Sequence, residues 1–421
     1  MNKIEFYKET NFKQTEIGEI PIDWKITNLS DKEVAEIIMG QSPPSTTYNK
    51  NGRGLPFLQG KMEFGEIYPS PAIYCSNPLK VAEQNDVLIS VRAPVGDVNI
   101  APYKLCIGRG LAAIRFNPEK ANFQFYFYYL KKIKSFLENL GKGSTFKAIN
   151  RDDLERLKIP LPPFEEQRAV AWVLSVVDLA IQRTDMVIAK TERLKKGLMQ
   201  TLLTRGIGHK EFKDTEIGKI PKTWRVATLG EIAKINKEQI DPTKSMPDKT
   251  FIYIDIDSVE NETGKIRNPK KILGRNAPSR ARRVVHENDV IMSTVRPYLK
   301  AFAIIPKEYD DQICSTGFAV LSCKKDIVIP YFLLIALFSE NVIKQCNQMM
   351  MGGQYPALNQ SQVSRIKIPL PSCDEQEKIA SIFYALDEKL ELERIEKKRL
   401  EMIKKGLMDL LLTGKVRVKV N

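Results

Sequence analysis

Residues 158–167 read KIPLPPFEEQ and residues 367–376 read KIPLPSCDEQ, and these two stretches decide the fold. In each, prolines close an extended segment and acidic residues follow, which is the composition preferred at the start of a helix. Long proline-free stretches come next in both cases. We therefore predict one long helix over 164–206 and a second helix, with a C-terminal tail, over 373–421.

A seven-residue repeat runs along both stretches. Its positions in the first are Val170, Val177, Thr184, Thr191 and Leu198, with Leu174, Ile181, Ile188, Lys195 and Leu202; in the second they are Ile379, Leu386, Glu393, Leu400 and Leu407, with Phe383, Leu390, Lys397, Lys404 and Leu411. This spacing is typical of a coiled coil, and each helix would be about 60 Å long. Because such a helix has too little core of its own, we predict that the two helices pack together.

The order of the segments predicts how the two helices run. The first helix leads almost directly into a second globular segment, so that segment begins at the far end of the helix. A second helix that starts from there and packs along the first must run antiparallel to it. The sequence leaves one alternative open, in which each helix folds only against its own domain.

The chain is an internal duplication. Residues 12–21 read FKQTEIGEIP and residues 212–221 read FKDTEIGKIP. The segment 143–204 recurs without a gap as 352–413, with 22 identical residues, where chance would give about four. We predict a first globular domain over 1–163, the first long helix over 164–206, a second globular domain over 207–372 and the second long helix with its tail over 373–421.

Between the repeated blocks the two copies diverge. The interiors 30–142 and 230–351 share little beyond NDVLIS at 85–90 and NDVIMS at 288–293. Short apolar stretches predict strands at 87–89, 111–116, 251–256 and 318–321, and helices are expected at 123–139 and 330–349. The predicted fold class is α/β, of mixed α+β type: two similar globular domains separated by a long antiparallel two-helix coiled coil, with pseudo-twofold symmetry. Trp24 and Trp224 lie in the shared frame and are assigned to the core.

The charge balance favours a polyanionic partner. The chain of 421 residues carries 65 Lys and Arg against 51 Asp and Glu, a net charge of +14. Residues 164–204 and 373–413 together carry 14 basic and 15 acidic residues, so the positive excess lies in the globular domains and the tails. Counterion release from phosphates requires such a surface, whereas a helix lying on a membrane would itself be basic. We therefore expect a nucleic acid as partner and no membrane.

Apolar runs and cysteines favour an intracellular protein without a structural metal. No apolar run reaches the roughly 20 residues that span a bilayer, and the first residues lack the apolar core of a signal peptide. The six cysteines form no CxxC pair, and the chain has two histidines, His209 and His286. We expect a cytoplasmic protein with reduced thiols and no zinc site.

Loops rich in glycine and polar residues supply the candidate nucleic-acid contacts. The segment GKGSTFK at 141–147 aligns with GGQY at 352–355, and both combine flexible backbone, hydrogen-bonding side chains and an aromatic ring. The candidates in these loops are Lys142, Ser144, Thr145, Lys147, Gln354 and Tyr355. Further candidates are Gln59, Lys61, Arg92 and Arg296, and the dense arginine cluster Arg275, Arg280, Arg282 and Arg283. The alternative interpretation is ordinary turns and solvated surface charges.

Enzyme motifs are absent or incomplete. GLPFLQGK at 54–61 resembles a phosphate-binding loop, but it has one residue too many, and Met62 stands where Ser or Thr should hold magnesium. Pro247 and Asp248 could begin a nuclease metal site, yet no suitably placed ExK follows. The chain has two histidines, and histidine is the side chain that most often acts as general acid or base, so acid–base catalysis is disfavoured. We predict that the chain is not an enzyme, with no catalytic residue and no metal ligand.

The ordered set of motifs resembles a known family. Two copies of T-E-I-G-x-I-P-x-x-W, each followed by a divergent interior, K-I-P-L-P, an E-Q pair, a long helix and K-K-G-L-M-x-x-L-L-T, resemble the specificity subunit of type I restriction–modification systems. The resemblance implies that each interior is a target recognition domain that reads one half of a bipartite duplex DNA site, and that the helices fix the spacing. It also implies two methyltransferase subunits and, in the larger complex, two restriction subunits. S-adenosylmethionine, ATP and magnesium would belong to those partners, so no cofactor is assigned to this chain.

Two other functions are kept as alternatives. An RNA-binding scaffold would prefer single-stranded RNA to duplex DNA, and the chain shows no RNA-binding signature. A DNA methyltransferase or nuclease fused to recognition modules would need a catalytic motif that the sequence does not show. Met199, Met402 and Met408 are candidates for a surface that docks the partner subunits, against the alternative that they pack in the core.

Overall fold

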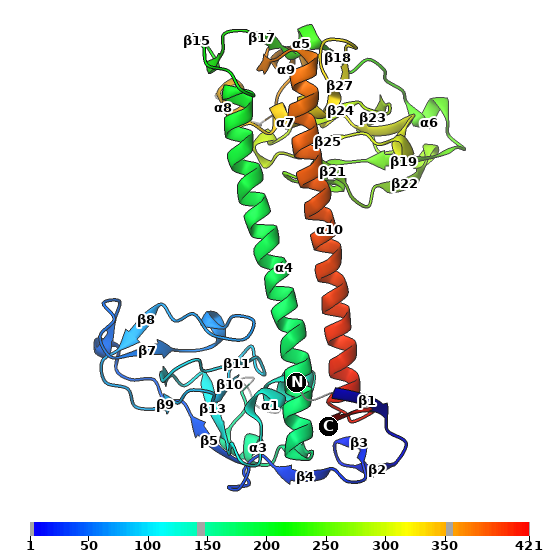
Figure 1. The fold of residues 1–421 in the computed structure, drawn as a ribbon. Coiled ribbons are helices and arrows are strands. Elements are labelled where there is room, and N and C mark those ends of the chain that lie inside the picture. The colour runs from blue at the N-terminus through cyan, green and yellow to red at the C-terminus, as the bar shows by residue number, and fades with distance from the viewer. Residues whose placement is uncertain (1–3, 141–147, 351–356, 421) are drawn as a thin grey trace. The chain divides into compact units, whose positions relative to one another are not determined.

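Figure 1 shows the computed structural model, which describes residues 4–140, 148–350 and 357–420. The chain forms two compact units. Unit 1 contains 1–185 and 395–421, and unit 2 contains 186–394. Each unit therefore includes one half of each long helix, whereas the sequence analysis separated the helices from the domains. Within the described residues, no helix is both long enough and apolar enough to cross a membrane.

Unit 1 holds two main sheets. Strands β11 (Val98–Ile100), β10 (Val87–Ser90), β13 (Leu111–Phe116) and β5 (Ala35–Met39) form, in that order, an antiparallel sheet. The second sheet has the order β6 (Tyr48–Asn49), β8 (Ile73–Cys75), β7 (Leu55–Leu58), β12 (Leu105–Ile107) and β9 (Val81–Ala82), with β7 and β12 parallel. Smaller pairs are β1 (Ile4–Lys8) with β29 (Val416–Val420), β2 (Phe12–Thr15) with β3 (Gly18–Pro21), and β4 (Lys25–Asn28) with β14 (Lys158–Leu161). The short helices are α1 (Phe123–Lys132), α2 (Lys134–Leu140) and α3 (Arg151–Glu155).

Unit 2 repeats this arrangement. Its first sheet has the order β25 (Phe302–Ile304), β24 (Val290–Ser293), β27 (Phe318–Cys323) and β18 (Ala233–Ile235), which matches the first sheet of unit 1 strand for strand. The second has the order β22 (Lys270–Leu273), β19 (Thr250–Ile254), β26 (Gln312–Ser315) and β23 (Ala281–Val285), again with a parallel central pair. Smaller pairs are β15 (Phe212–Thr215) with β16 (Gly218–Pro221), β17 (Arg225–Thr228) with β28 (Lys367–Leu370), and β20 (Val259–Glu260) with β21 (Lys265–Ile266). The short helices are α5 (Leu229–Ile232), α6 (Pro242–Ser245), α7 (Pro330–Leu337), α8 (Glu340–Met350) and α9 (Gln360–Ser364).

The strands and helices predicted for the interiors are confirmed, with changes at their ends. The helix predicted over 123–139 is divided into α1 and α2, and the one over 330–349 into α7 and α8. Strand β19 ends at Ile254 rather than at residue 256, because Asp255 caps a 3₁₀ turn and its carboxylate accepts a hydrogen bond from the Ser258 N–H (3.0 Å). All six cysteines are free thiols, as expected.

The motif that the two interiors share makes the same turn in each. Asn85 and Asn288 have positive φ angles of 72° and 67°, which asparagine tolerates better than most residues. The residue after each, Asp86 or Asp289, accepts a hydrogen bond from the backbone N–H three positions before it (2.8 and 3.0 Å). The turn leads into β10 or β24, in which every residue is buried. The turn geometry therefore accounts for the shared NDV sequence.

The two long helices, α4 (Phe164–Arg205) and α10 (Cys373–Leu411), contact each other within each unit. In unit 1, Asp178 pairs with Lys404 (2.5 Å), and Asp185, seven residues later on α4, pairs with Lys397, seven residues earlier on α10 (2.6 Å). In unit 2, Glu192 pairs with Arg394 (2.9 Å), and Lys195 pairs with Asp387, which is the copy of the Asp178–Lys404 pair. Because the partners move in opposite directions along the two helices, the pairing is antiparallel. The predicted antiparallel coiled coil is confirmed, and the alternative of helices packed only on their own domains is wrong.

The predicted seven-residue repeat forms the face along which the helices pack. None of its positions is exposed. Among its polar members, Thr184 and Thr191 are buried, Glu393 is half-buried, and the lysines form ion pairs across the helix pair. The imperfections of the repeat therefore fix the register of the two helices.

The repeated frame joins each interior to the long helices. Trp24 Nε1 donates a hydrogen bond to Glu166 Oε2 (3.1 Å) in unit 1, and Trp224 Nε1 donates to Glu375 Oε2 (2.9 Å) in unit 2. Both indole rings are buried, as predicted. The tryptophan and the first residue of the E-Q pair are therefore partners in one structural contact.

The glutamine of each E-Q pair bonds the backbone on both sides of it. Gln167 Nε2 donates to the carbonyl oxygens of Pro162 (2.9 Å) and Lys120 (3.1 Å), and its Oε1 accepts from the Asn122 N–H (2.8 Å). Gln376 makes the same three contacts, with Pro371, Ile327 and Ile329. Each glutamine thus ties the segment before α1 or α7 to the start of a long helix.

Candidate nucleic-acid interface

Four loop segments of unit 1 meet where its strands end. A Cβ atom on Gly40, after β5, would collide with the carbonyl oxygen of Gly108, after β12. A Cβ atom on Gly110 would lie 2.7 Å from the carbonyl oxygen of Gln59, after β7. The N–H of Val91, after β10, donates to the Gly110 carbonyl oxygen (2.9 Å). Residues 40–42, 59–60, 91–92 and 108–110 are called the unit 1 loop cluster below.

Exposed polar side chains extend from the unit 1 loop cluster. Gln59, Arg92 and Arg109 are exposed, and in the part of the chain that the structure describes their side chains make no hydrogen bond or ion pair. Lys61 differs, because it pairs with Asp97, which also binds Lys134 (2.5 Å). Burial alone would raise the pKa of the Asp97 carboxyl. The two lysines outweigh burial and hold that pKa below its usual value. Lys61 is therefore engaged within the protein.

The equivalent loops of unit 2 meet in the same way. The N–H of Thr294, after β24, donates to the Gly317 carbonyl oxygen (2.8 Å), as Val91 does to Gly110 in unit 1. The N–H of Leu358 donates to the Thr294 carbonyl oxygen (2.9 Å), and the N–H of Thr316 donates to that of Arg280 (2.8 Å). Residues 280, 294–296, 316–317 and 357–358 are called the unit 2 loop cluster below.

Two arginines are exposed on the unit 2 loop cluster. Arg280 and Arg296 make no side-chain hydrogen bond or ion pair with any described residue. Arg296 has a φ of 47°, in the left-handed region that residues other than glycine rarely adopt. Such a conformation is found more often at functional positions than elsewhere in a fold.

The four arginines of the predicted cluster differ in burial and in ion pairing. Arg275 pairs with Asp248, and Arg282 is half-buried and pairs with Asp241 (3.4 Å). Arg283 is also half-buried, and burial lowers the pKa of its guanidinium group. Its Nε and Nη1 atoms are buried without a hydrogen-bond partner among the described residues. Of the four arginines, Arg280 is the one that is both exposed and unpaired within those residues.

Six predicted contact residues lie outside the described residues. They are Lys142, Ser144, Thr145, Lys147, Gln354 and Tyr355. Sequence reasoning missed Arg109, which lies in the unit 1 loop cluster between Gly108 and Gly110. A Gly-Arg-Gly sequence directly after the apolar strand 105–107 is the signal that could have found it.

The two loop clusters carry different side chains at matching positions. The parallel strand registers pair Leu58 with Ile107 in unit 1 and Ile254 with Cys314 in unit 2. Counting from these pairs places Asp255 where unit 1 has Gln59, and Thr316 where unit 1 has Arg109. The clusters thus share a backbone arrangement and differ in hydrogen-bonding chemistry.

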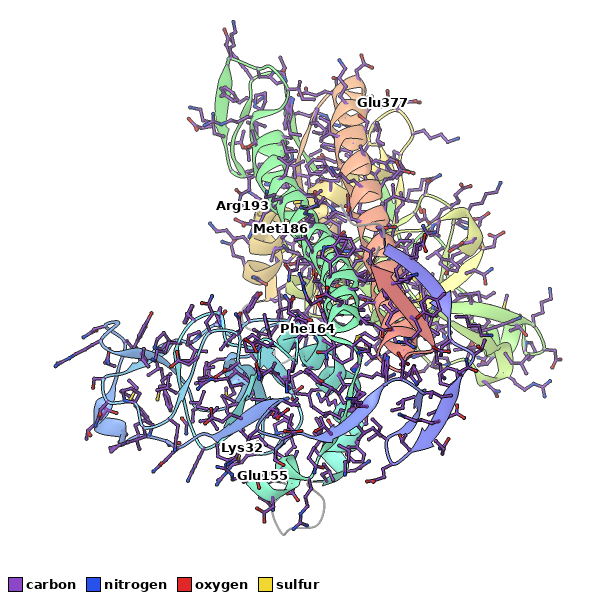
Figure 2. The ribbon with its side chains drawn as sticks, turned by 60° about the horizontal axis from the view of Figure 1, so that its bottom comes forward. Lys32, Glu155, Phe164, Met186, Arg193 and Glu377 are labelled. Atoms are coloured by element: carbon purple, nitrogen blue, oxygen red, sulfur yellow. The ribbon has the colours of Figure 1, made fainter. Side chains whose placement is uncertain are left out.

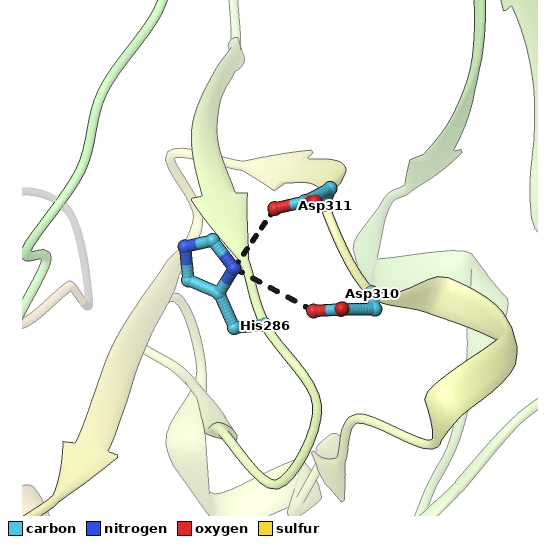
Figure 3. A group of neighbouring side chains, drawn as sticks. All are labelled: His286, Asp310 and Asp311. Atoms are coloured by element: carbon cyan, nitrogen blue, oxygen red, sulfur yellow. Dashed lines mark ion pairs between the residues drawn. The ribbon is translucent and has the colours of Figure 1, made fainter.

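One group in unit 2 has the residue types of a metal site (Figure 3). His286 Nδ1 lies 3.0 Å from Asp311 Oδ1 and 3.5 Å from Asp310 Oδ1, and its Nε2 lies 3.1 Å from Glu238 Oε2. Burial lowers the pKa of His286, but the carboxylates around it outweigh that effect and raise the pKa above its ordinary value. Both aspartates are exposed, and the charge pairing accounts for the arrangement.

Comparison with known proteins identifies the family. The family model described as "Type I restriction modification DNA specificity domain" matches residues 21–190 and 221–402. The chain belongs to this family. The two matched segments correspond to the two copies of the duplication, so each unit carries one specificity domain.

Two relatives and one solved structure show how far the likeness extends. The putative type I restriction enzyme MjaX specificity subunit of Methanocaldococcus jannaschii is 56% identical over 198 residues, which is 47% of each chain. The MjaVIII specificity subunit of the same organism is 29% identical over 99% of this chain and 98% of its own length. The crystal structure of a type I restriction–modification S subunit from M. genitalium has a TM-score of 0.60 and 19% identity, over 93% of this chain and 96% of that chain, and shows the same fold.

The predicted function is confirmed at the level of the family. The chain is a DNA specificity subunit of a type I restriction–modification system. Such subunits recognise DNA sequence, while catalysis lies in the partner methyltransferase and restriction subunits. The chain is therefore a recognition component and not an enzyme.

Proposed function

We propose that each loop cluster binds one half of a bipartite duplex DNA site and that the paired helices set the spacer between the halves. The observation that carries this proposal is the contrast between the frame and the clusters. The tryptophan and the E-Q pair of the frame bond to each other and to the backbone alike in both units. In contrast, Arg109 of unit 1 is replaced by Thr316 in unit 2, and the exposed Gln59 is replaced by Asp255, whose carboxylate binds Ser258 and Lys270 within the protein. One scaffold with two sets of reading side chains fits two unlike half-sites.

The exposed side chains have the chemistry that DNA recognition requires. Arginine pairs with guanine edges, and glutamine pairs with adenine, in the major groove. Exposed cations also contact phosphates and orient the protein on the duplex. We assign base contact to Gln59 and Arg109, and base or phosphate contact to Arg92, Arg280 and Arg296.

The helices limit the spacer. Helix α4 has 42 residues. At 1.5 Å per residue it is about 60 Å long, which corresponds to an upper limit of roughly 18 base pairs. The spacer is expected to be shorter, because the recognition domains themselves reach along the DNA.

The partner subunits complete the assembly. We propose that two methyltransferase subunits bind this chain and that two restriction subunits join them in the full complex, in the cytoplasm. S-adenosylmethionine, ATP and magnesium are assigned to those subunits, and no cofactor or metal to this chain. Purified alone, the chain should neither methylate nor cut DNA in the presence of these cofactors.

Exchanging one interior tests the division of labour. Residues 30–142 are replaced by the corresponding interior of another family member, and the methylated sequence is mapped across the host genome. One half of the recognised site should change, while the other half and the spacer stay the same. The reciprocal exchange of 230–351 should change the other half. A change of both halves in either exchange would contradict the proposal.

Shortening the helices tests the spacer separately. One heptad is deleted from 171–196 and one from 380–405, so that the antiparallel register is preserved. Both half-sites should remain readable at a shorter spacing. Unchanged spacing would contradict the role of the helices without affecting the assignment of half-sites.

A further inference from the structure

In unit 1, one carboxylate joins the interior to both long helices. Asp178 of α4 accepts a hydrogen bond from the hydroxyl of Tyr128 on α1 (2.7 Å). Its other oxygen pairs with Lys404 of α10 (2.5 Å). Tyr128 and Asp178 are buried, and burial together with the neighbouring carboxylate raises the pKa of the Tyr128 hydroxyl, which therefore stays a hydrogen-bond donor. These three residues are called the unit 1 triad below.

Unit 2 contains the same group of residues with the two long helices exchanged. Asp387 of α10 accepts a hydrogen bond from the hydroxyl of Tyr331 on α7 (2.6 Å), and its other oxygen pairs with Lys195 of α4. Figure 2 labels Arg193, two residues before this lysine. Burial and the Asp387 carboxylate raise the pKa of the Tyr331 hydroxyl as well. Tyr331, Asp387 and Lys195 are called the unit 2 triad below.

The aspartate and the lysine of the two triads are copies of each other in the duplication. Asp387 lies 209 positions after Asp178, and Lys404 lies 209 positions after Lys195, which is the constant offset between the repeated blocks. Because the helices are antiparallel, each unit receives the aspartate of one copy and the lysine of the other. The duplication alone therefore explains why both units have this ion pair.

The duplication does not explain the tyrosines, which come from different turns of their helices. Asn122 and Ile329, just before α1 and α7, are matching positions, because each donates its N–H to the glutamine of an E-Q pair (2.8 and 2.9 Å). Tyr128 lies six residues after Asn122, whereas Tyr331 lies two residues after Ile329. A shift of four residues is about one turn and keeps the same face of the helix. In α7 the position that matches Tyr128 is Ile335. The hydrogen bond is thus present in both units although the tyrosine has moved by one turn.

Apolar contacts also hold the interiors on the long helices, but they do not fix a direction. In unit 1, Phe125 of α1 shares a core cluster with Leu174 of α4. Met408 packs against this core and Met199 against the core of unit 2, whereas Met402 is exposed. Burial of apolar area is non-directional, while a hydrogen bond requires a short distance and an aligned donor. The triads therefore supply an orientation that the apolar contacts lack.

We propose that the two triads hold each interior in one orientation on the helix pair, and that this fixed orientation makes the protein accept a single spacer length. The inference rests on the proposed function, in which the helices set the spacer, and it names the residues that make this setting strict. An interior free to rotate could reach a half-site displaced by one base pair. Tyr128 and Tyr331 are positioning residues, because they act through the helices and not by contact with DNA.

Removing the two hydroxyl groups tests the inference. Tyr128→Phe and Tyr331→Phe, alone and together, are made in the full-length chain, which is combined with its methyltransferase subunits. Fluorescence anisotropy measures binding to duplexes that carry both mapped half-sites with the native spacer, or with one base pair more or fewer. Because hydrogen bonds to charged groups are among the stronger ones, the preference for the native spacer should fall about tenfold in the double variant. Each single variant should show a smaller fall, and the base preference within each half-site should not change.

Tyr126→Phe is the matched control. Tyr126 is buried on the same helix as Tyr128, but its hydroxyl donates to the carbonyl oxygen of Pro160 in β14 (3.0 Å) and not to a long helix. This variant should lower the melting temperature of the chain about as much as Tyr128→Phe does, because each loses one buried hydrogen bond. Its preference for the native spacer should equal that of the wild type.

The outcomes separate this inference from the proposed function. A wild-type spacer preference in the double variant would overturn the inference. An equal fall for Tyr126→Phe would also overturn it, because the effect would then follow from lost stability. Deleting heptads moves the preferred spacer, whereas loss of the triads widens the accepted range, so the two roles are tested independently. A wild-type complex that binds every spacer length equally would overturn the proposed role of the helices itself.

Discussion

In unit 1 the loops that follow β7, β10 and β12 carry Gln59, Arg92 and Arg109. In unit 2 the matching loops follow β19, β24 and β26 and carry Asp255, Arg296 and Thr316. The strands agree although the sequences of the two interiors have little in common. Buried strands require apolar residues of suitable size rather than particular ones. The loops are free of that requirement, so their side chains differ while the scaffold stays the same.

A second contrast lies at the turn that both interiors share. In unit 1, Glu83 at this turn pairs with Lys104 (2.8 Å), while in unit 2 the same position is His286, which pairs with Asp311 (3.0 Å). The ion pair is kept with its charges reversed. The two units therefore keep the contact with different residue types, and the pair in unit 2 contains an imidazole.

The third contrast concerns the glutamate that binds the frame tryptophan. In unit 1, Arg417 from the C-terminal strand donates to Glu166 (2.6 Å), to Asp23 (2.8 Å) and to Glu9 (2.7 Å). In unit 2, Glu375 receives hydrogen bonds from the Ile207 N–H (2.9 Å) and Trp224, with His209 Nε2 at 2.9 Å. Unit 1 thus depends on one buried cation, and unit 2 on several weaker contacts.

The largest expected effect comes from removing that cation. Arg417→Ala leaves the buried carboxylate of Glu166 without its charged partner and should destabilise unit 1 by about 3 kcal/mol. His209→Ala should cost less, because Glu375 retains its other hydrogen bonds. Hydrogen exchange followed by mass spectrometry in denaturant would report each unit separately. An equal loss of protection in both units after Arg417→Ala would contradict this comparison.

An intermediate effect is expected at the loop clusters. Arg109→Ala removes a proposed base contact and should weaken binding to the cognate duplex by about 2 kcal/mol, or roughly 30-fold. The loss should be confined to the half-site read by unit 1, and the variant should tolerate base changes there. Binding to a panel of duplexes with substitutions in each half-site would measure it. Lys104→Ala, which removes an ion-paired lysine of the same unit, is the control, and an equal loss for it would argue against base contact.

The smallest expected effect is the pH response of His286. Since its pKa is raised above the ordinary value of 6.5 in the folded protein, folding favours the protonated form. Its stabilisation is therefore complete below pH 6.5 and disappears as the pH rises through the folded pKa. The difference in melting temperature between wild type and His286→Asn should shrink over that interval. A constant difference for His286→Asn would contradict the assignment.

Much of the architecture could be predicted from the sequence because it depends on local patterns. The duplication, the long helices and their antiparallel order follow from repeats and a seven-residue period, which are visible without knowing any distant contact. The burial of Trp24 and Trp224 also followed from their place in the repeated frame. Gln59, Arg92, Arg280 and Arg296 were identified from residue type, and the structure places them exposed in the loop clusters.

Other features depended on contacts between residues far apart in the chain. Lys61 and Arg275 are of residue types that often contact DNA, but in the structure they form ion pairs with Asp97 and Asp248. Arg109 was overlooked because its importance comes from Gly40 and Gln59, which lie near it only after the strands have paired. The equal strand order of the two interiors was hidden for the same reason, since strand pairing is set by packing over long sequence separations.

The sequence by itself determined that this protein is a doubled chain with two long paired helices, because periodicity and repetition are properties of neighbouring residues. The tertiary structure alone decided which polar side chains form internal ion pairs and which are left exposed. That division depends on distances between residues that are remote in sequence, and those distances exist only once the sheets and helices have packed.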